Sequence, residues 1–487
     1  MICGASPIAR PGAGRGERQV FMTVVNSVKG IGVVLLMGAA AVIASHAQTF
    51  TTLVKFNLTN GAFPAYVSLV QGTNGYLYGT TEYGGTDGIG TIFKITPGGK
   101  LTTLYSFLFT NGEEEPEGAD PLVGLIQATN GDFYGTTESG GDNSHGNYGT
   151  VFKVTPSGTL TTLHSFAYIP DGAYPAALVQ ATNGDFYGTT QYGGDGYYGS
   201  VFKITIAGSL TTLHSFSGTD GLYPLAGLIQ ATNGNLYGTT QQGGTSNNCL
   251  NGCGTVFKIT PSGTLTTLYS FGLSSDGGLP AAGLIQATDG NFYGTTCGTV
   301  FKITPGGKLT TLHSFDCVDG QAPVALVQGT DGNFYGTASS GGANGYGMIF
   351  QITPSGALTT LHSFDLTDGA YPEGGLVQAT NGDFYGTTFG GTSPSLGDGT
   401  IFRLSMGLGP FVKTLPTSGK VGASIKILGT NLTGAINVTF NGTAAVFTVV
   451  SPSLITTTVP AGATTGTVQV VTPGGALSSN VTFLVRP

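Results

Sequence analysis

The chain has 487 residues, of which 9% are charged and 83 are glycine, and its formal net charge is −8. Few charges with much glycine are typical of low-complexity chains, but 28 Phe, 21 Tyr and plentiful aliphatic residues can build a buried core. Thr and Tyr enrichment with regularly spaced glycine favours strands and tight turns. The basic residues are scattered and form no patch, which argues against nucleic-acid binding and against anionic membrane surfaces.

The N-terminal segment has the pattern of a secretory signal peptide. Lys29 precedes the apolar run IGVVLLMGAAAVIA (31–44), and the small residues Ser45 and Ala47 follow it. The run is short for a membrane span of about 20 residues, the alternative. We expect cleavage after Ala47.

Met22 would start a signal peptide of ordinary length, so residues 1–21 are read as an upstream extension. No Cys stands at the cleavage point, which argues against a lipoprotein. Removing the four basic residues and one acidic residue of segment 1–47 from the totals of 17 and 25 leaves 13 and 24, a net charge of −11. We expect no membrane attachment after cleavage.

An exported chain with an even number of cysteines is expected to form disulfides. Four cysteines remain after cleavage, and two of them could close a small ring in the loop CLNGC. A structural zinc site is the rival and free thiols are a further alternative, but no His lies near in sequence. The candidates for disulfide bonding are Cys249, Cys253, Cys297 and Cys317.

Four strand-like segments recur along the chain. A first strand of the type GLIQAT is followed by an Asn-Gly or Asp-Gly pair, which favours a type I′ hairpin. The second strand is DFYGTT, a variable Gly-rich loop leads to the third, GTVFKIT, and a tight turn leads to the fourth, LTTLHSF. A tyrosine of the second strand marks each copy, at spacings of 42 to 56 residues: Tyr78, Tyr134, Tyr187, Tyr237, Tyr293, Tyr335 and Tyr385.

This period, with four strands per unit, predicts the blades of a β-propeller, and a capped solenoid is the alternative. Phe50–Phe56 is a fourth strand with no first three before it, and the last repeat, Gly375–Ser405, has only three strands. The N-terminal strand can complete that repeat. We therefore predict an all-β fold: a seven-bladed propeller over 48–406, closed by its N-terminal strand and leaving no free edge.

Residues present in every repeat are expected to be scaffold. One Phe on each third strand and one at the end of each fourth strand predict packing between blades. A Gln on each first strand either satisfies backbone groups between blades or lines a polar channel: Gln71, Gln127, Gln180, Gln230, Gln286, Gln328 and Gln378. Four fourth strands carry a His, which we read as an edge residue too far from the others to share a metal: His164, His214, His313 and His362.

Function on a repeat scaffold is expected in the loops where the repeats differ. The second-to-third and fourth-to-first loops should share one face, the variable face, with the uniform turns on the other. The insert at 108–120 is acidic, whereas the insert at 139–148 and the loop 193–198 mix Asp, Asn, Gly and Tyr, which suit sugar binding as well as ordinary loops. The candidate ligand-binding residues are Glu113, Glu114, Glu115, Asp142, Asn143, Tyr148, Asp195 and Tyr197.

The acidic run at 113–115 could hold calcium, but its spacing is not that of an EF-hand, so we expect no cofactor or metal. No catalytic motif is found: there is no G-x-S-x-G, H-E-x-x-H or P-loop. Carboxylates from different blades could meet at a channel mouth, which the sequence cannot show. Recurrent Asp-Gly pairs are read as turns: Asp171, Asp220, Asp276, Asp319 and Asp368.

After a short linker at 407–410 the chain changes character. Short Thr-rich strands and turns at Asn441-Gly442 and Pro473-Gly474-Gly475 predict a β-sandwich over 411–487. The run LPTSG, then IKILGTNL, VTFNG, VPAG and VVTPGG resembles the IPT/TIG family, which implies an immunoglobulin-like spacer or binding accessory.

The repeats over about 61–405 resemble the GloVer-type tandem repeats of exported bacterial proteins, through G-L-x-Q-x-x-x-G-x-x-Y-G-T-T, then G-G and G-x-x-F-K. The motif is complete at Gly124–Lys153 and Gly227–Lys258. The resemblance implies export and surface display, with no activity attached. A looser similarity runs to streptogramin-lyase-type propellers, without a matching His/Glu site.

The sequence leads to two hypotheses. The first is an exported, non-enzymatic monomer whose variable face binds a glycan or another surface protein. The second is a polysaccharide lyase or hydrolase whose carboxylates cluster at the channel mouth.

Overall fold

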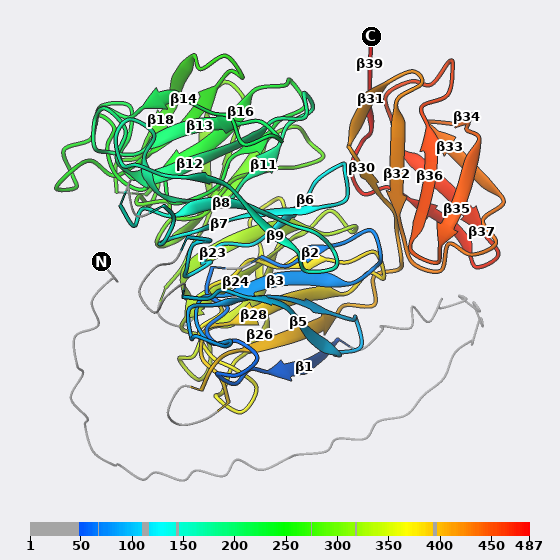
Figure 1. Ribbon diagram of the computed structural model, residues 1–487, viewed down its shortest axis with the longest axis horizontal. Helices are drawn as coiled ribbons and strands as arrows, with labels where there is room; N and C mark the ends of the chain where they lie inside the picture. Colours follow the sequence, from blue (N-terminus) through cyan, green and yellow to red (C-terminus); the bar gives the residue numbers. More distant parts are fainter. Residues whose placement is uncertain are drawn as a thin grey trace, which may run out of the picture. The chain divides into compact units, whose positions relative to one another are not determined.

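The structure is a computed structural model that describes residues 48–66, 68–109, 116–142, 146–273, 275–316, 319–392 and 397–487 (Figure 1). The described residues are all-β, with strands β1 to β39 and no helix. None of the described segments forms a helix long and apolar enough to span a membrane. The expected signal peptide, residues 1–47, lies outside the described residues.

The repeats form antiparallel sheets that are numbered here 1 to 7 along the chain. Sheet 1 contains β2 (Val70–Gln71), β3 (Leu77–Thr81), β4 (Thr91–Ile95) and β5 (Leu101–Ser106). Sheet 2 contains β6 (Ile126–Gln127), β7 (Phe133–Thr137), β8 (Thr150–Val154) and β9 (Leu160–Ser165). Sheet 3 contains β10 (Ala173–Pro175), β11 (Val179–Gln180), β12 (Phe186–Tyr192), β13 (Ser200–Ile204) and β14 (Leu210–Ser215).

Sheet 4 contains β15 (Ile229–Gln230), β16 (Leu236–Thr240), β17 (Thr255–Ile259) and β18 (Leu265–Ser270). Sheet 5 contains β19 (Ile285–Gln286), β20 (Phe292–Thr295), β21 (Thr299–Ile303) and β22 (Leu309–Ser314). Sheet 6 contains β23 (Gln321–Gln328), β24 (Phe334–Ser340), β25 (Met348–Ile352) and β26 (Leu358–Ser363). Sheet 7 contains β27 (Val377–Gln378), β28 (Phe384–Thr388), β29 (Thr400–Ser405) and β1 (Thr49–Lys55).

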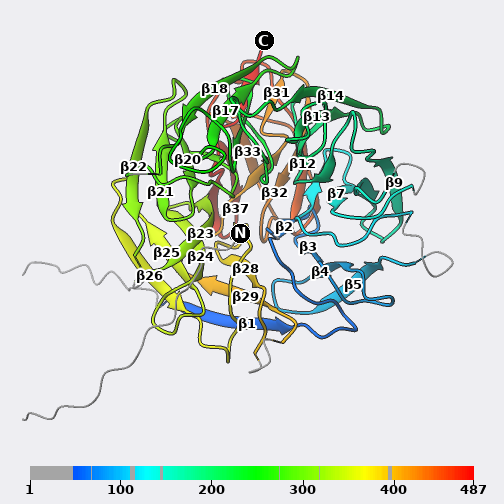
Figure 2. The same ribbon diagram turned by 90° about the vertical axis from the view of Figure 1, so that its left-hand side faces the viewer.

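The arrangement is propeller-like. In Figure 2 the sheets follow one another around a centre, with the short first strands innermost and the fourth strands outermost. The N-terminal strand takes the outer place in sheet 7: β1 pairs antiparallel with β29, from Thr49 opposite Ser405 to Lys55 opposite Thr400. The first segment after the predicted signal peptide therefore completes the last repeat.

The recurrent glutamines join each sheet to the one before it. The Gln127 Oε1 atom accepts from the Thr73 N–H at 2.8 Å, and the Gln127 Nε2 atom donates to the Gly131 carbonyl of its own hairpin at 3.0 Å. The inter-sheet bond recurs at every junction, and the last one joins sheet 7 back to sheet 1 through Thr380 and Gln71. This confirms the structural reading of these side chains.

The repeated aromatic residues fill the space between sheets. Tyr78 of sheet 1 stacks on Phe133 of sheet 2 with ring centroids 4.0 Å apart. Tyr78, Phe133, Phe107 and Phe152 belong to one buried cluster, so fourth-strand and third-strand Phe residues meet across the junction. Each buried aromatic contributes about 1.5–3 kcal/mol relative to exposure. The prediction that these residues pack adjacent repeats is confirmed.

The Asn-Gly pair does not form the expected type I′ hairpin. Gly131 has a φ of 101°, but Asn130 is not among the residues with positive φ, and the Gly131 N–H donates to the Ala128 carbonyl. The side chain explains the choice of Asn: its Oδ1 accepts from the Asp132 N–H at 3.0 Å, and its Nδ2 donates to the Tyr134 hydroxyl at 3.0 Å. Asn is present for these bonds and not for a left-handed backbone.

The C-terminal segment forms the predicted sandwich. One sheet holds β30 (Lys413–Leu415), β32 (Ser424–Leu428), β36 (Leu454–Thr458) and β35 (Phe447–Ser451), and the other holds β34 (Thr443–Ala444), β33 (Asn437–Phe440), β37 (Val468–Thr472) and β38 (Gly475–Ser478). Two further strands pair in parallel: β31 (Ser418–Lys420) and β39 (Leu484–Arg486). Alternate strand residues such as Ile425, Ile427, Val468 and Val470 point into a common core.

Candidate functional site

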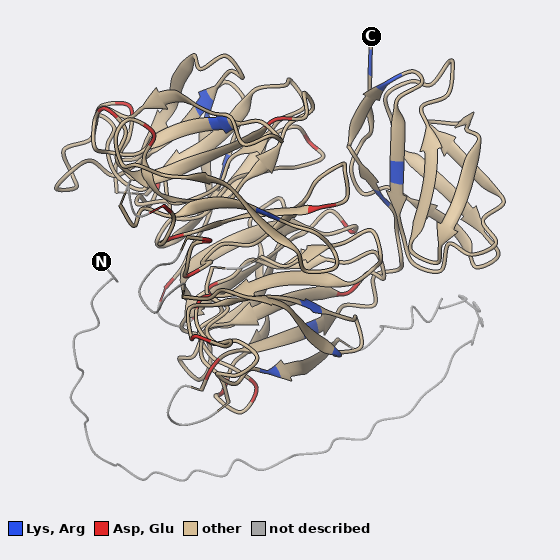
Figure 3. Cartoon of the chain, in the orientation of Figure 1, with Lys and Arg blue, Asp and Glu red and all other residues tan. Residues whose placement is uncertain are grey.

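The two kinds of variable loop lie together, as expected. Isolated bridges join a fourth-to-first loop with the loop after the second strand of the following repeat, for example Ala62 with Tyr83 and Leu222 with Gln242. Acidic residues are seen in these loops in Figure 3, while Lys and Arg lie mainly on strands. The loops of the variable face are therefore joined between neighbouring repeats and carry more acidic than basic residues.

The variable face carries a strained backbone position in every repeat. The residue before the proline that leads to each first strand has a left-handed φ although it is not glycine, which costs on the order of 1–3 kcal/mol per site. These residues are Phe63, Asp120, Tyr174, Tyr223, Leu279, Ala322 and Tyr371, with φ between 50° and 57°. The regularity makes this position part of the scaffold, whereas its side chains differ.

At the inner part of this face lies a group that we call the inner carboxylate cluster: Tyr66, Glu82, Asp120, Glu138 and Glu373. Glu82 and Glu138 directly follow β3 and β7, whereas the others precede first strands. All four carboxyl groups are half-buried, and Tyr66 is 59% exposed. Residues from sheets 1, 2 and 7 and their loops thus act on one another electrostatically.

Burial and mutual repulsion make these carboxyl groups reluctant to ionise. Burial, with repulsion from Glu82, raises the pKa of Glu373 to about 7. The pKa of Glu138 is raised by burial and by the charges of Glu82 and Asp120. Burial also raises the pKa of Asp120, against a hydrogen bond of 2.7 Å from Ser139 Oγ. Glu373 can therefore exchange a proton near neutral pH.

Tyr66 of the cluster, and Tyr83 next to Glu82 in the chain, stay protonated at physiological pH. Burial and the nearby carboxylates of Glu373, Glu82 and Glu138 raise the pKa of Tyr66 to about 12. The pKa of Tyr83 is also raised to about 12, first by its hydrogen bond with Glu82 and then by burial. The cluster therefore offers neutral phenol groups beside carboxyl groups.

The ligand-binding residues predicted from the sequence lie elsewhere on the variable face. Glu113, Glu114, Glu115 and Asn143 fall outside the described residues. Asp142 is exposed, and its N–H donates to Ser165 Oγ at 3.1 Å.

The remaining predicted residues belong to one neighbourhood. Tyr148 and Tyr197 both lie near Tyr168, with ring centroids 5.1 and 6.2 Å from its ring. Asp195 is exposed and its N–H donates to Ser215 Oγ at 3.2 Å. The structure therefore brings the predicted tyrosines together.

Cys249 and Cys253 form the expected disulfide bond, with Cα atoms 5.2 Å apart. Cys297 is half-buried, and Cys317 lies outside the described residues, so their pairing stays a prediction. No group of His, Cys, Asp and Glu side chains that could hold a metal ion is found in the described part of the chain.

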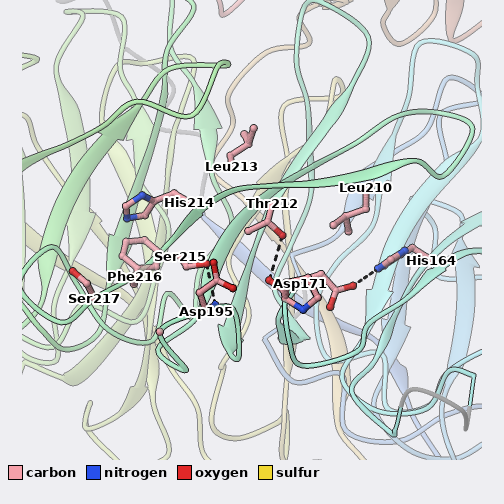
Figure 4. A pocket seen from close by; sticks show the side chains of 12 residues that line it. His164, Asp171, Asp195, Leu210, Thr212, Leu213, His214, Ser215, Phe216 and Ser217 are labelled. Carbon is pink, nitrogen blue, oxygen red and sulfur yellow. Dashed lines mark hydrogen bonds and ion pairs between the residues drawn. The ribbon is translucent and has the colours of Figure 1, made fainter.

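A groove of about 910 Å³ opens between the outer strands β9 and β14 (Figure 4). His164 and Asp171 form a hydrogen bond in it, with His Nε2 2.7 Å from Asp Oδ2. Equivalent His–Asp pairs recur in three further repeats, through His214, His313 and His362. Their recurrence identifies the pair as scaffold and not as a single reactive centre.

The Asp-Gly residues are more than turn formers. Asp171 accepts from His164 through Oδ2 and from the Ala167 N–H through Oδ1 at 3.0 Å, so it clasps the end of the fourth strand to its loop. Burial raises the pKa of Asp171, but the bonds from His164 and Ala167 outweigh it and hold the pKa below its ordinary value. The histidines, predicted as edge residues, are half-buried partners of these clasps.

The inner carboxylate cluster has no local signal in the sequence, because its members come from several repeats and loops. An indirect signal exists in the repeat alignment. Where Glu82 and Glu138 follow the second strand, the other repeats have Gln191, Gln241, Cys297, Ser339 and Phe389. Aligning the residues around each strand end would have singled out these acidic exceptions.

Comparison with solved structures shows the fold. A streptogramin B lyase is 18% identical with a TM-score of 0.51, over 74% of this chain and 97% of that one. Virginiamycin B lyase from Staphylococcus aureus is 17% identical with the same TM-score, over 74% and 99%. An extracellular domain of a one component system from B. thetaiotaomicron is 11% identical with a TM-score of 0.48, over 91% and 58%. No curated protein matches the chain.

Family models cover nearly all of the repeat region and the sandwich. The Gloeobacter/Verrucomicrobia repeat model matches residues 27–146, 113–297 and 295–445, and the IPT/TIG domain model matches residues 411–485. Both resemblances expected from the sequence are confirmed. The chain belongs to the Gloeobacter/Verrucomicrobia repeat family and carries an IPT/TIG domain after its repeats.

Proposed function

We propose that the protein is an exported, monomeric surface protein that binds a glycan or protein on the variable face of a closed, seven-bladed propeller. Closure is supported by β1, which supplies the outer strand of sheet 7, and by the Gln–Thr bonds that continue from sheet 7 to sheet 1. Export is supported by the signal-like segment 1–47 and by the Cys249–Cys253 disulfide.

The convergence of repeat-breaking residues carries this proposal. Repeats two to six place only Leu, Val or Ala at the two positions after the proline, whereas Tyr66 and Glu373 stand there in the first and last repeats. Tyr66 interacts electrostatically with Glu373 and with Glu82 and Glu138, which are also exceptions to the repeat. Exceptions that are far apart in sequence but interact in space are expected of a binding site and not of a scaffold.

The chemistry of the cluster favours an uncharged ligand with many hydroxyl groups, or a protein surface. Protonated carboxyl and phenol groups donate hydrogen bonds, and ionised carboxylates accept them. The acidic surface disfavours nucleic acid and other polyanions. These preferences agree with the glycan or protein ligand expected from the sequence.

The test is a glycan-array and surface-protein binding screen with residues 48–487 and with a variant carrying Glu82→Gln, Glu138→Gln and Glu373→Gln. Binding that falls at least tenfold in the variant supports the proposal. Absence of any ligand, or a ligand bound equally by both proteins, contradicts it. Urea denaturation of both proteins separates loss of binding from loss of folding.

A second candidate function is a polysaccharide hydrolase or lyase, which one observation favours. The pKa of Glu373 is raised to about 7 beside the carboxyl group of Glu82. Two neighbouring carboxyl groups with different proton affinities are what general acid–base catalysis requires. Incubation with a panel of polysaccharides tests this candidate: release of new reducing ends or unsaturated products, lost in Glu373→Gln, supports it, and no release on any polysaccharide contradicts it.

A further inference from the structure

A dense group of tyrosines occupies the variable face over sheets 2 to 4. We call it the tyrosine field; its members are Tyr148, Tyr168, Tyr192, Tyr197, Tyr198 and Tyr223. Tyr148, Tyr168 and Tyr197 form one run of ring contacts, and Tyr192 lies 5.0 Å from Tyr223. The two groups adjoin, because Tyr168 and Tyr198 lie close enough to Tyr223 to act on its ionisation.

The field spans a junction between repeats. The Tyr223 N–H donates to the Tyr198 carbonyl at 3.0 Å, which ties the loop before β15 to the loop before β13. The same bond joins Tyr174 to Tyr148 one repeat earlier, at 3.0 Å. Backbone hydrogen bonds between loops of successive repeats therefore hold together the segments that carry Tyr148, Tyr198 and Tyr223.

The backbone shows that tyrosine is placed here at a cost. Tyr168 and Tyr197 both have a φ of 65°, in the left-handed region that favours Gly or Asn. Tyr197 is also 56% exposed, so its ring contributes little to the core. A large aromatic side chain at an exposed and strained position indicates that the ring itself is used.

The charged residues around the tyrosine field favour a ligand that is not a polyanion. Burial and the neighbouring tyrosines raise the pKa of Tyr223, so its phenol is neutral at physiological pH. Between residues 142 and 223 the only Lys or Arg residues of the sequence are Lys153 and Lys203, which lie on the third strands β8 and β13, while Asp142 and Asp195 are exposed in the loops. Polyanions such as nucleic acids and uronic acid polymers are therefore disfavoured.

We propose that the tyrosine field binds a chain of neutral sugars, with the rings stacking on apolar sugar faces and the phenol groups bonding to sugar hydroxyls. The inference rests on the proposed binding function of the variable face and names the class of ligand. The tyrosine field extends over several repeats, which fits a polysaccharide better than a single sugar.

The experiment is affinity electrophoresis of residues 48–487 in gels that contain barley β-glucan, xyloglucan, galactomannan or starch, with polygalacturonate as the charged comparison. We expect retardation by at least one neutral polysaccharide and none by polygalacturonate. Tyr197→Gly keeps the left-handed backbone and removes an exposed ring, so its apparent Kd should rise about tenfold without loss of stability. Tyr168→Gly is the second variant.

Leu250→Ala is the matched control, because Leu250 is 97% exposed in a variable loop of sheet 4 outside the field. Retardation should be unchanged in this variant. The inference is overturned if no neutral polysaccharide retards the protein, if only polygalacturonate does, or if the tyrosine variants bind as the wild type does. A protein ligand lost in the Glu82, Glu138 and Glu373 variant but kept by Tyr197→Gly would overturn this inference and leave the proposed function standing.

Discussion

The side-chain oxygen of Gln71 accepts a hydrogen bond of 2.9 Å from the backbone N–H of Thr380, and this bond joins the first sheet of the repeat region to the last. The Gln71 Nε2 atom also donates to Thr380 Oγ1 at 3.1 Å. Thr380 is fully buried, so water cannot replace the lost partner if the glutamine is removed.

Gln71→Ala should therefore lower the free energy of unfolding by about 1–3 kcal/mol, because a buried donor is left unsatisfied. The matched control is Gln180→Ala, whose partner Thr129 is exposed and can bond to water. That change should cost about 0.5–1.5 kcal/mol. Urea denaturation of the two variants measures the difference. Equal losses of unfolding free energy would show that the Gln71–Thr380 bond contributes no more to stability than the bond between Gln180 and Thr129.

Glu373 should make stability depend on pH. Its pKa is raised to about 7 in the folded protein, above the ordinary value of a carboxyl group. The unfolded chain therefore ionises first as pH rises, and stability is lost between about pH 4.5 and pH 7. Solvent screening of the half-buried group limits the loss to about 1–2 kcal/mol.

Glu373→Gln removes this ionisable group and is the variant that measures its effect. The variant and the wild type should be similarly stable at pH 4.5, and the variant should be more stable at pH 8. Thermal or urea unfolding at several pH values gives both curves. Parallel curves over this range would contradict the raised pKa.

The fold followed from the sequence because each repeat carries the same local signals. One Gln, one Tyr and two Phe per repeat, at fixed places, were enough to predict the sheets, their packing and the pairing of β1 with β29. The predicted hairpin type was wrong. An Asn-Gly pair favours a left-handed backbone at Asn, but Asn130 does not have a positive φ, and its side chain instead accepts a hydrogen bond from the Asp132 N–H.

The candidate site could be predicted only in part. Tyr148 and Tyr197 could be singled out because unusual loop residues stand out against the repeat, and they stay predicted ligand-binding residues. The inner carboxylate cluster was missed, because Glu82 and Glu373 become neighbours only once the chain has returned around the centre. A His-to-Asp spacing such as that of His164 and Asp171 was visible, but its hydrogen bond depends on how the loop folds back.

The His–Asp clasps should contribute to stability and not to binding. Asp171→Ala removes the acceptor for His164 and for the Ala167 N–H, and it should cost about 1–3 kcal/mol at neutral pH. The pKa of Asp171 is lowered in the folded protein, so its contribution is present above the ordinary carboxyl pKa and is lost as pH falls below it. Urea denaturation at pH 7 and pH 3 measures this.

Asp195→Ala is the control for this clasp, because Asp195 lines the same groove but is exposed. It should change stability by less than about 0.5 kcal/mol. The stabilising role of the His164–Asp171 bond would be refuted if both variants lost the same free energy of unfolding. It would also be refuted if the loss for Asp171→Ala were as large at pH 3 as at pH 7.

The Cys249–Cys253 disulfide should stabilise its loop without being needed to hold it in place. The loop is also fixed by the Gly243 N–H donating to the Asn251 carbonyl at 2.7 Å and by Asn251 Nδ2 donating to Gln242 Oε1 at 3.1 Å. Closing a ring of this size reduces the entropy of the unfolded chain by an amount worth about 2 kcal/mol. Replacing both cysteines with Ser should cost that much in urea denaturation, and limited proteolysis should still spare the loop. Rapid cleavage next to Leu250 in the double variant alone would show that the disulfide, and not the hydrogen bonds, holds the loop.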